Sequence, residues 1–103
     1  MIDIDKMHCH AIEVANWLKT IAHPERLMVL CQLTKGEVPL KELQQNSSLG
    51  QSALSQHLAI LKAQKLVSFR KQSQQVFYSL ADDKSKQLLE ALQGICCVSE
   101  EKK

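Results

Sequence analysis

The sequence lacks the features that place a chain in a membrane or carry it across one. No stretch approaches the roughly 18 apolar residues that a transmembrane helix needs. Residues 1–6 contain no basic segment leading into an apolar run, so we expect no signal peptide. A cytoplasmic protein is therefore predicted. Four cysteines in that reducing compartment favour sensing, metal binding or inert packing over a disulfide framework.

Signatures of enzymes are also missing. The chain has neither a Gly-rich phosphate loop nor a nucleophile elbow, so we expect no enzymatic activity and no cofactor. It also has no internal repeat, linker or low-complexity stretch, and its length predicts one domain over residues 1–103. Such a domain buries only a small core, so a dimer interface is expected to contribute to its stability.

The first half of the sequence has a helical pattern. Apolar residues recur near a 3.6-residue period over residues 6–22, which predicts an amphipathic helix. A second helix is expected to begin at Pro24 and to stop at Gly36 in a left-handed conformation. Pro39 is expected to open a short third helix. Gly50 is expected to be the N-cap of a fourth helix.

A β-hairpin and a last helix are predicted in the second half. Residues 66–71 and 75–80 are rich in Val, Phe and Tyr and flank a polar turn at residues 72–74. Asp82 is a plausible N-cap for a helix that runs to about Val98. The predicted order is ααααββα, mainly helical with a β-hairpin wing.

The fourth helix carries polar residues on one face and apolar residues on the other. With a short helix before it and a hairpin after it, this pattern indicates a winged helix-turn-helix that binds double-stranded DNA. In that motif the second helix lies in the major groove. Glutamine can pair with adenine through two hydrogen bonds, and serine can serve several bases. The candidate base-contacting residues are Gln51, Ser52, Ser55, Gln56 and His57.

Cations near the turn of the hairpin are candidates for phosphate contacts. Arg70 and Lys71 would bind phosphates beside the groove, with Gln74 as a neutral donor nearby. Each phosphate neutralised should steepen the slope of log K against log salt by about 0.9. The alternatives are a solvated polar helix face and a cationic strand edge that blunts sheet pairing.

The cysteines allow several interpretations. Cys9 stands between His8 and His10, a trio that could ligate zinc or copper. Together with Cys31 or Cys96 it could also complete a thiolate site for arsenite or another soft ion. The alternative for the trio is a solvated start of the first helix. Cys31 lies among leucines, where cysteine is often a small buried hydrophobe.

Several motifs together resemble the ArsR/SmtB family of dimeric winged-helix repressors, over a span from about Trp17 to Cys97. The motifs are Leu18–Leu27, Gln51–Leu58 with Leu61, and Val76–Tyr78. The resemblance implies a homodimer in which the first and last helices pair across a two-fold axis. It also implies a palindromic operator whose successive major grooves receive the two recognition helices.

The usual metal ligands of that family are absent. Residues 38–40 stand where one class has Cys-x-Cys, and residues 82–87 contain no histidine where another class has it. The chain then resembles the BigR/SqrR/HlyU branch, whose two cysteines are matched by Cys31 and Cys97, with Cys96 as the alternative partner. This resemblance implies a repressor that senses reactive sulfur or oxidants and releases DNA when the pair becomes a polysulfide or disulfide. The alternative is a metal- or arsenite-responsive repressor that uses cysteine thiolates.

Overall fold

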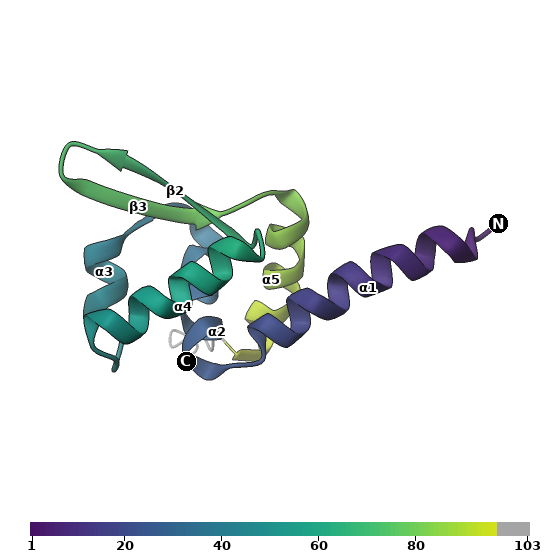
Figure 1. Ribbon diagram of the computed structural model, residues 1–103, viewed down its shortest axis with the longest axis horizontal. Coiled ribbons are helices and arrows are strands. Elements are labelled where there is room, and N and C mark those ends of the chain that lie inside the picture. Colours follow the sequence, from purple (N-terminus) through teal and green to yellow (C-terminus); the bar gives the residue numbers. More distant parts are fainter. Residues whose placement is uncertain (97–103) are drawn as a thin grey trace.

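The computed structural model describes residues 1–96, with residue 96 described by its backbone alone. The elements are α1 (Ile4–Ile21), α2 (Pro24–Gln32), the 3-10 helix η1 (Leu33–Lys35), β1 (Val38–Pro39), α3 (Leu40–Gln45), α4 (Gln51–Ala63), β2 (Val67–Gln72), β3 (Gln75–Leu80) and α5 (Asp83–Cys96). The hairpin β2–β3 extends from one side of the body, and the N-terminal part of α1 projects from the other (Figure 1). Within the described residues, no helix combines the length and hydropathy needed to cross a membrane.

Aspartate side chains define the starts of the first and last helices. α1 begins two residues earlier than predicted, because Asp3 accepts a hydrogen bond from the backbone N–H of Lys6 at 3.1 Å. The predicted N-cap at Asp82 is confirmed. Its carboxylate accepts from the N–H of Ser85 at 2.9 Å and from the Ser85 hydroxyl at 3.0 Å. These hydrogen bonds lower the pKa of Asp82. The predicted helix end at Val98 lies outside the described residues.

Two glycines mark predicted helix boundaries. Gly50 is the N-cap of α4, as expected, with φ −71° and ψ 170°. The helical segment that starts at Pro24 stops at Gly36, although its last turn, η1, is a 3-10 helix. Gly36 has φ 135° and ψ −165°. Its φ is positive as expected, but its ψ is extended and not left-handed, because the chain continues directly into a strand.

That strand, β1, was not predicted, and it makes the wing a three-stranded antiparallel sheet in the order β1–β3–β2. Val38 pairs with Tyr78 and Pro39 with Phe77. Two residues are too few to show alternation, so only the distant partner strand reveals β1. As a result the third helix begins at Leu40, after Pro39.

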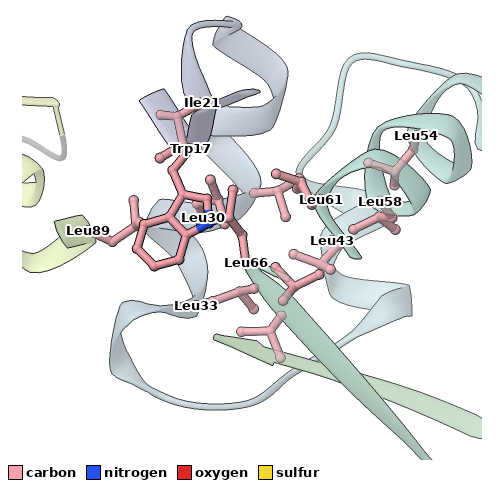
Figure 2. Packing of buried hydrophobic residues seen from close by; sticks show 13 residues of the cluster. Trp17, Ile21, Leu30, Leu33, Leu43, Leu54, Leu58, Leu61, Leu66 and Leu89 are labelled. Carbon is pink, nitrogen blue, oxygen red and sulfur yellow. The ribbon is translucent and has the colours of Figure 1, made fainter. Parts of the chain in front are cut away.

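The core is built mainly from leucines contributed by nearly all of the elements (Figure 2). Three of them, Leu54, Leu58 and Leu61, form the buried side of α4, whereas Ala53, expected on the same apolar side, is half-buried. α1 contributes Trp17, whose indole N–H donates to the Gln64 carbonyl at the C-terminal end of α4 over 3.2 Å. The end of the first helix is thereby attached to the end of the fourth.

Most of the predicted apolar face of α1 is not part of this core. The side chains of Ile12, Val14 and Leu18 are 53, 37 and 46% exposed. The helix buries only Trp17, Thr20 and Ile21 against its own chain. The apolar period predicted the helix correctly, but much of its apolar surface does not face this chain's core.

Candidate nucleic-acid interface

The first turns of α4 present a cluster of exposed polar side chains. Because Leu54, Leu58 and Leu61 fix the buried side of the helix, four of the predicted DNA-contacting residues are left exposed. They occupy positions i, i+1, i+4 and i+5, which adjoin on one side of a helix. The four are Gln51, Ser52, Ser55 and Gln56.

His57, the fifth predicted residue, lies against α2. It is half-buried, and its Nδ1 accepts a hydrogen bond from Nε of Arg26 at 3.1 Å. Its ring centroid is 4.4 Å from that of His23, the N-cap of α2. Burial, and then the neighbouring charges of His23 and Arg26, lower the pKa of His57. A neutral His57 is the form that accepts from Arg26, and the contact joins α4 to α2.

A groove lies between α4, the second helix of the helix-turn-helix and hence its recognition helix, and the hairpin β2–β3. It is lined by α3, the start of α4 and the hairpin turn, and it contains both Gln51 and Gln74 from the predicted set. Lys41 and Gln44 of α3 line the same groove and were missed by the sequence analysis. The first helix of a helix-turn-helix crosses the DNA backbone, and that role could have drawn attention to the polar residues of the short third helix.

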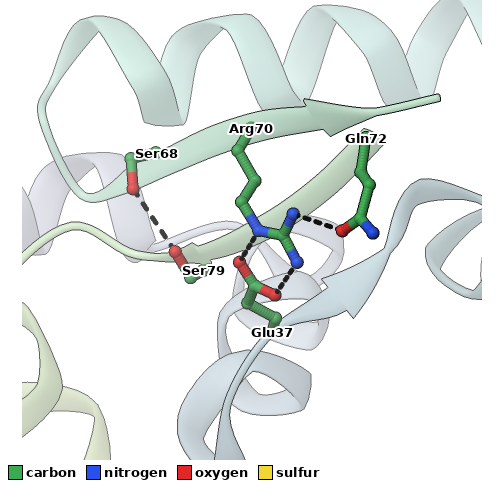
Figure 3. A network of polar contacts seen from close by, with 5 residues as sticks. All are labelled: Glu37, Ser68, Arg70, Gln72 and Ser79. Carbon is green, nitrogen blue, oxygen red and sulfur yellow. Dashed lines mark hydrogen bonds and ion pairs between the residues drawn. The ribbon is translucent and has the colours of Figure 1, made fainter. Parts of the chain in front are cut away.

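In the wing, the Arg70 side chain already forms hydrogen bonds to other side chains of this chain. Its Nε donates to Glu37 at 2.6 Å and its Nη2 donates to the other carboxylate oxygen at 2.8 Å, while Nη1 donates to Gln72 at 2.7 Å (Figure 3). The hydrogen bonds from Arg70 lower the pKa of Glu37. Lys71, the adjacent cation, is exposed. Glu37 carried no signal in the sequence, because its partner lies 33 residues away.

Cys31 lies near the end of α2 and is half-buried. α2 packs against α5, the helix that ends at Cys96. Cys97, the partner predicted for Cys31, lies outside the described residues. The arrangement does place the helix of Cys31 beside the helix that leads to both candidate partners.

The other cysteine interpretation concerns α1. His8, Cys9 and His10 are all exposed on its N-terminal part. Successive residues of an α-helix are about 100° apart, so three consecutive side chains diverge instead of converging on one ion. Among the described residues, no group of three or more His, Cys, Asp or Glu side chains could hold a metal ion.

A helix with an exposed polar face, preceded by a short helix and followed by a β-hairpin, defines the winged helix-turn-helix class of DNA-binding protein. Residues 23–68 match the family model described as bacterial regulatory protein, arsR family. The chain is 44% identical to the biofilm growth-associated repressor of Agrobacterium fabrum, over 97% of this chain and 86% of that protein.

Solved structures agree in fold and length. The transcriptional repressor BigR from Xylella fastidiosa superposes with a TM-score of 0.83 at 42% identity, covering 98% of this chain and 99% of that one. Reduced HlyU from Vibrio cholerae gives a TM-score of 0.82 at 39% identity, covering 90% and 98%. The chain belongs to the arsR family of bacterial regulatory proteins and is a transcriptional repressor of that type.

Proposed function

We propose that this repressor is a cytoplasmic homodimer that holds a palindromic operator while its cysteines are reduced. It releases the operator when Cys31 is bridged to Cys97, with Cys96 as the alternative partner. The observation that supports this most directly is the position of Cys31. It is half-buried on α2, so a small oxidant can reach it, and α2 is a helix that packs against α5. The likeness to HlyU in its reduced form agrees with a redox role.

Oxidation of such a pair of cysteines can give two products. With peroxide, the two thiols lose two electrons and two protons, which reduce one peroxide to two waters and leave a disulfide. With an organic persulfide, each thiol first accepts one sulfur atom and releases a thiol. A third persulfide then takes up two electrons and two protons, leaving a tetrasulfide, a further thiol and hydrogen sulfide. The inserted sulfur atoms relax the limit of about 7 Å between Cα atoms that a plain disulfide imposes.

Intact mass with tandem mapping of the cysteines tests this proposal. Reduced protein is exposed in turn to an organic persulfide, glutathione disulfide and peroxide, with Cys96→Ser and Cys97→Ser variants in parallel. A gain of two sulfurs and loss of two hydrogens, spanning residue 31 and one of residues 96 and 97, identifies a reactive-sulfur sensor. A plain disulfide from every oxidant identifies a general redox switch. Absence of any cross-link contradicts the thiol mechanism and favours a metal- or arsenite-responsive repressor.

We also propose that the exposed cluster on α4 reads the operator bases, with Lys71 and Gln74 of the wing at the phosphates. The support is exposure: the cluster is free of core packing at the end of the helix that enters the groove. His57 and Arg70, predicted for the same surface, already hydrogen-bond within the protein.

Gln56→Ala should reduce the ratio of affinities for operator and shuffled duplex by about 5- to 150-fold for each half-site, because a two-point contact to one base is lost in each. The operator is first selected from random duplexes by binding to the wild type. Gln64→Ala, an exposed position at the other end of α4, is the matched control and should preserve the ratio. An unchanged ratio in Gln56→Ala would remove this residue from base reading.

A further inference from the structure

The hairpin has two chemically different faces. Side chains alternate along a strand, so Phe69 and Lys71 share one face of β2, and Ser68 and Arg70 share the other. The rings of Phe69 and Tyr78 pack edge to face, with their centroids 5.7 Å apart. Nζ of Lys62 on α4 lies 4.0 Å from the centre of the Phe69 ring. The face with Phe69 and Lys71 is therefore turned toward the recognition helix. A groove shared by Phe69, Tyr78, Lys62 and Ser55 confirms this orientation.

The opposite face carries the contacts of Arg70. Its guanidinium lies 4.7 Å from the centre of the Phe77 ring and forms the two-point ion pair with Glu37. Phe77 is on the middle strand, β3, whereas Glu37 directly precedes β1 and Arg70 is on β2. The ion pair therefore spans the sheet from one outer strand to the other, as Figure 3 shows. It joins the hairpin to the segment that follows η1.

The ion pair also limits what Arg70 can bind. Three of its nitrogens already donate, two of them to a carboxylate. A phosphate at this position would have to displace Glu37 and would then lie beside its negative charge. Lys71 has no such constraint, since it forms no ion pair within the described part of the chain. It also lies on the face turned toward α4.

We propose that Arg70 is a positioning residue and not a phosphate ligand: with Glu37 and Phe77 it fixes the angle of the wing, so that Lys71 on the opposite face reaches the DNA backbone. This inference rests on the proposed DNA contacts and assigns a role to Glu37. The pair is exposed on both sides, so its effect is expected to be modest, but it is transmitted to the whole hairpin.

The test compares operator affinity over a range of salt concentrations for Arg70→Gln, Glu37→Gln, the double variant and Lys71→Gln. Lys71→Gln removes the same charge from the adjacent position. It should reduce the slope of log K against log salt by about 0.9 for each wing, hence by about 1.8 for a dimer. Arg70→Gln and Glu37→Gln should each weaken binding about two- to fivefold with the slope unchanged. The double variant should bind no more weakly than either single variant, because one interaction is lost in all three.

Arg70→Lys separates charge from geometry. Lysine keeps the positive charge but not the two-point fork, so binding should stay at the level of Arg70→Gln. A flattened slope in Arg70→Gln that Lys restores, or tighter binding by Glu37→Gln, would make Arg70 a phosphate ligand and overturn the proposal. So would unchanged affinity in both single variants, or an unchanged slope in Lys71→Gln. Failure of the wild type to bind any duplex would instead contradict the proposed DNA contacts themselves.

Discussion

Replacing Cys31 with serine should give a repressor that binds its operator normally and no longer releases it. Serine is close to cysteine in size, and the site is half-buried beside Thr34, whose hydroxyl donates to the Cys31 carbonyl, a contact that the substitution leaves in place. The wild type should lose about 5- to 150-fold in affinity on treatment with persulfide or oxidant, the usual range of allosteric coupling. The Cys31→Ser variant should lose none.

The measurement is operator affinity before and after treatment, followed by reduction to show that the wild type recovers. Cys9→Ser is the matched control, because Cys9 is exposed on α1, a different helix from α2, which carries Cys31. It should respond like the wild type. A normal response in Cys31→Ser would mean that another residue reacts with the oxidant or persulfide. A response lost in Cys9→Ser would identify Cys9 on α1 as that residue.

Leu18→Asp should have the largest effect on DNA binding, about 10²- to 10⁴-fold, through loss of the dimer. Ile4, Met7, Val14 and Leu18 are all exposed and follow one another at spacings of three, seven and four residues, which aligns them along one side of α1. An aspartate at position 18 of this stripe would be buried without a partner in a two-fold pairing. A monomer holds one half-site only and loses the gain from joining two binding modules.

Sedimentation or light scattering measures the oligomeric state, and operator affinity is measured on the same samples. Asn16→Asp adds the same charge two residues earlier, about 200° around the helix, and is the matched control. It should remain dimeric. If Leu18→Asp is still a dimer with unchanged affinity, the exposed stripe of α1 is not the interface, and the role predicted for the first helix is wrong.

Local patterns were enough to predict most of the fold. The leucine spacing of α4, the N-cap at Asp82 and the polar turn of the hairpin are short-range signals, and each confirmed element depends on residues within a few positions of one another. The strand β1 was missed because two residues carry no period of their own and pair only with β3.

The site was predicted less completely, for the same reason. His57 follows directly after Gln56 in a polar run, and only the position of Arg26 on α2 shows that its ring is directed inward. Arg70 and Lys71 are equivalent as neighbouring cations in the sequence. Strand alternation assigns them to opposite faces of the sheet. The position of Glu37 then determines that Arg70 is the one that forms an ion pair within the protein.

The hydrogen bond between the Trp17 indole and the Gln64 carbonyl has a geometric consequence for operator recognition. It holds α4 at its C-terminal end, whereas the polar cluster lies at the other end of a helix of 13 residues, about 20 Å away at 1.5 Å per residue. A tilt of about 5° at the held end moves the far end by about 1.7 Å, which exceeds the spread of hydrogen-bond lengths. A rotation of α4 about that end, with the helices packed against it, would therefore separate the polar cluster from the bases that we propose it contacts.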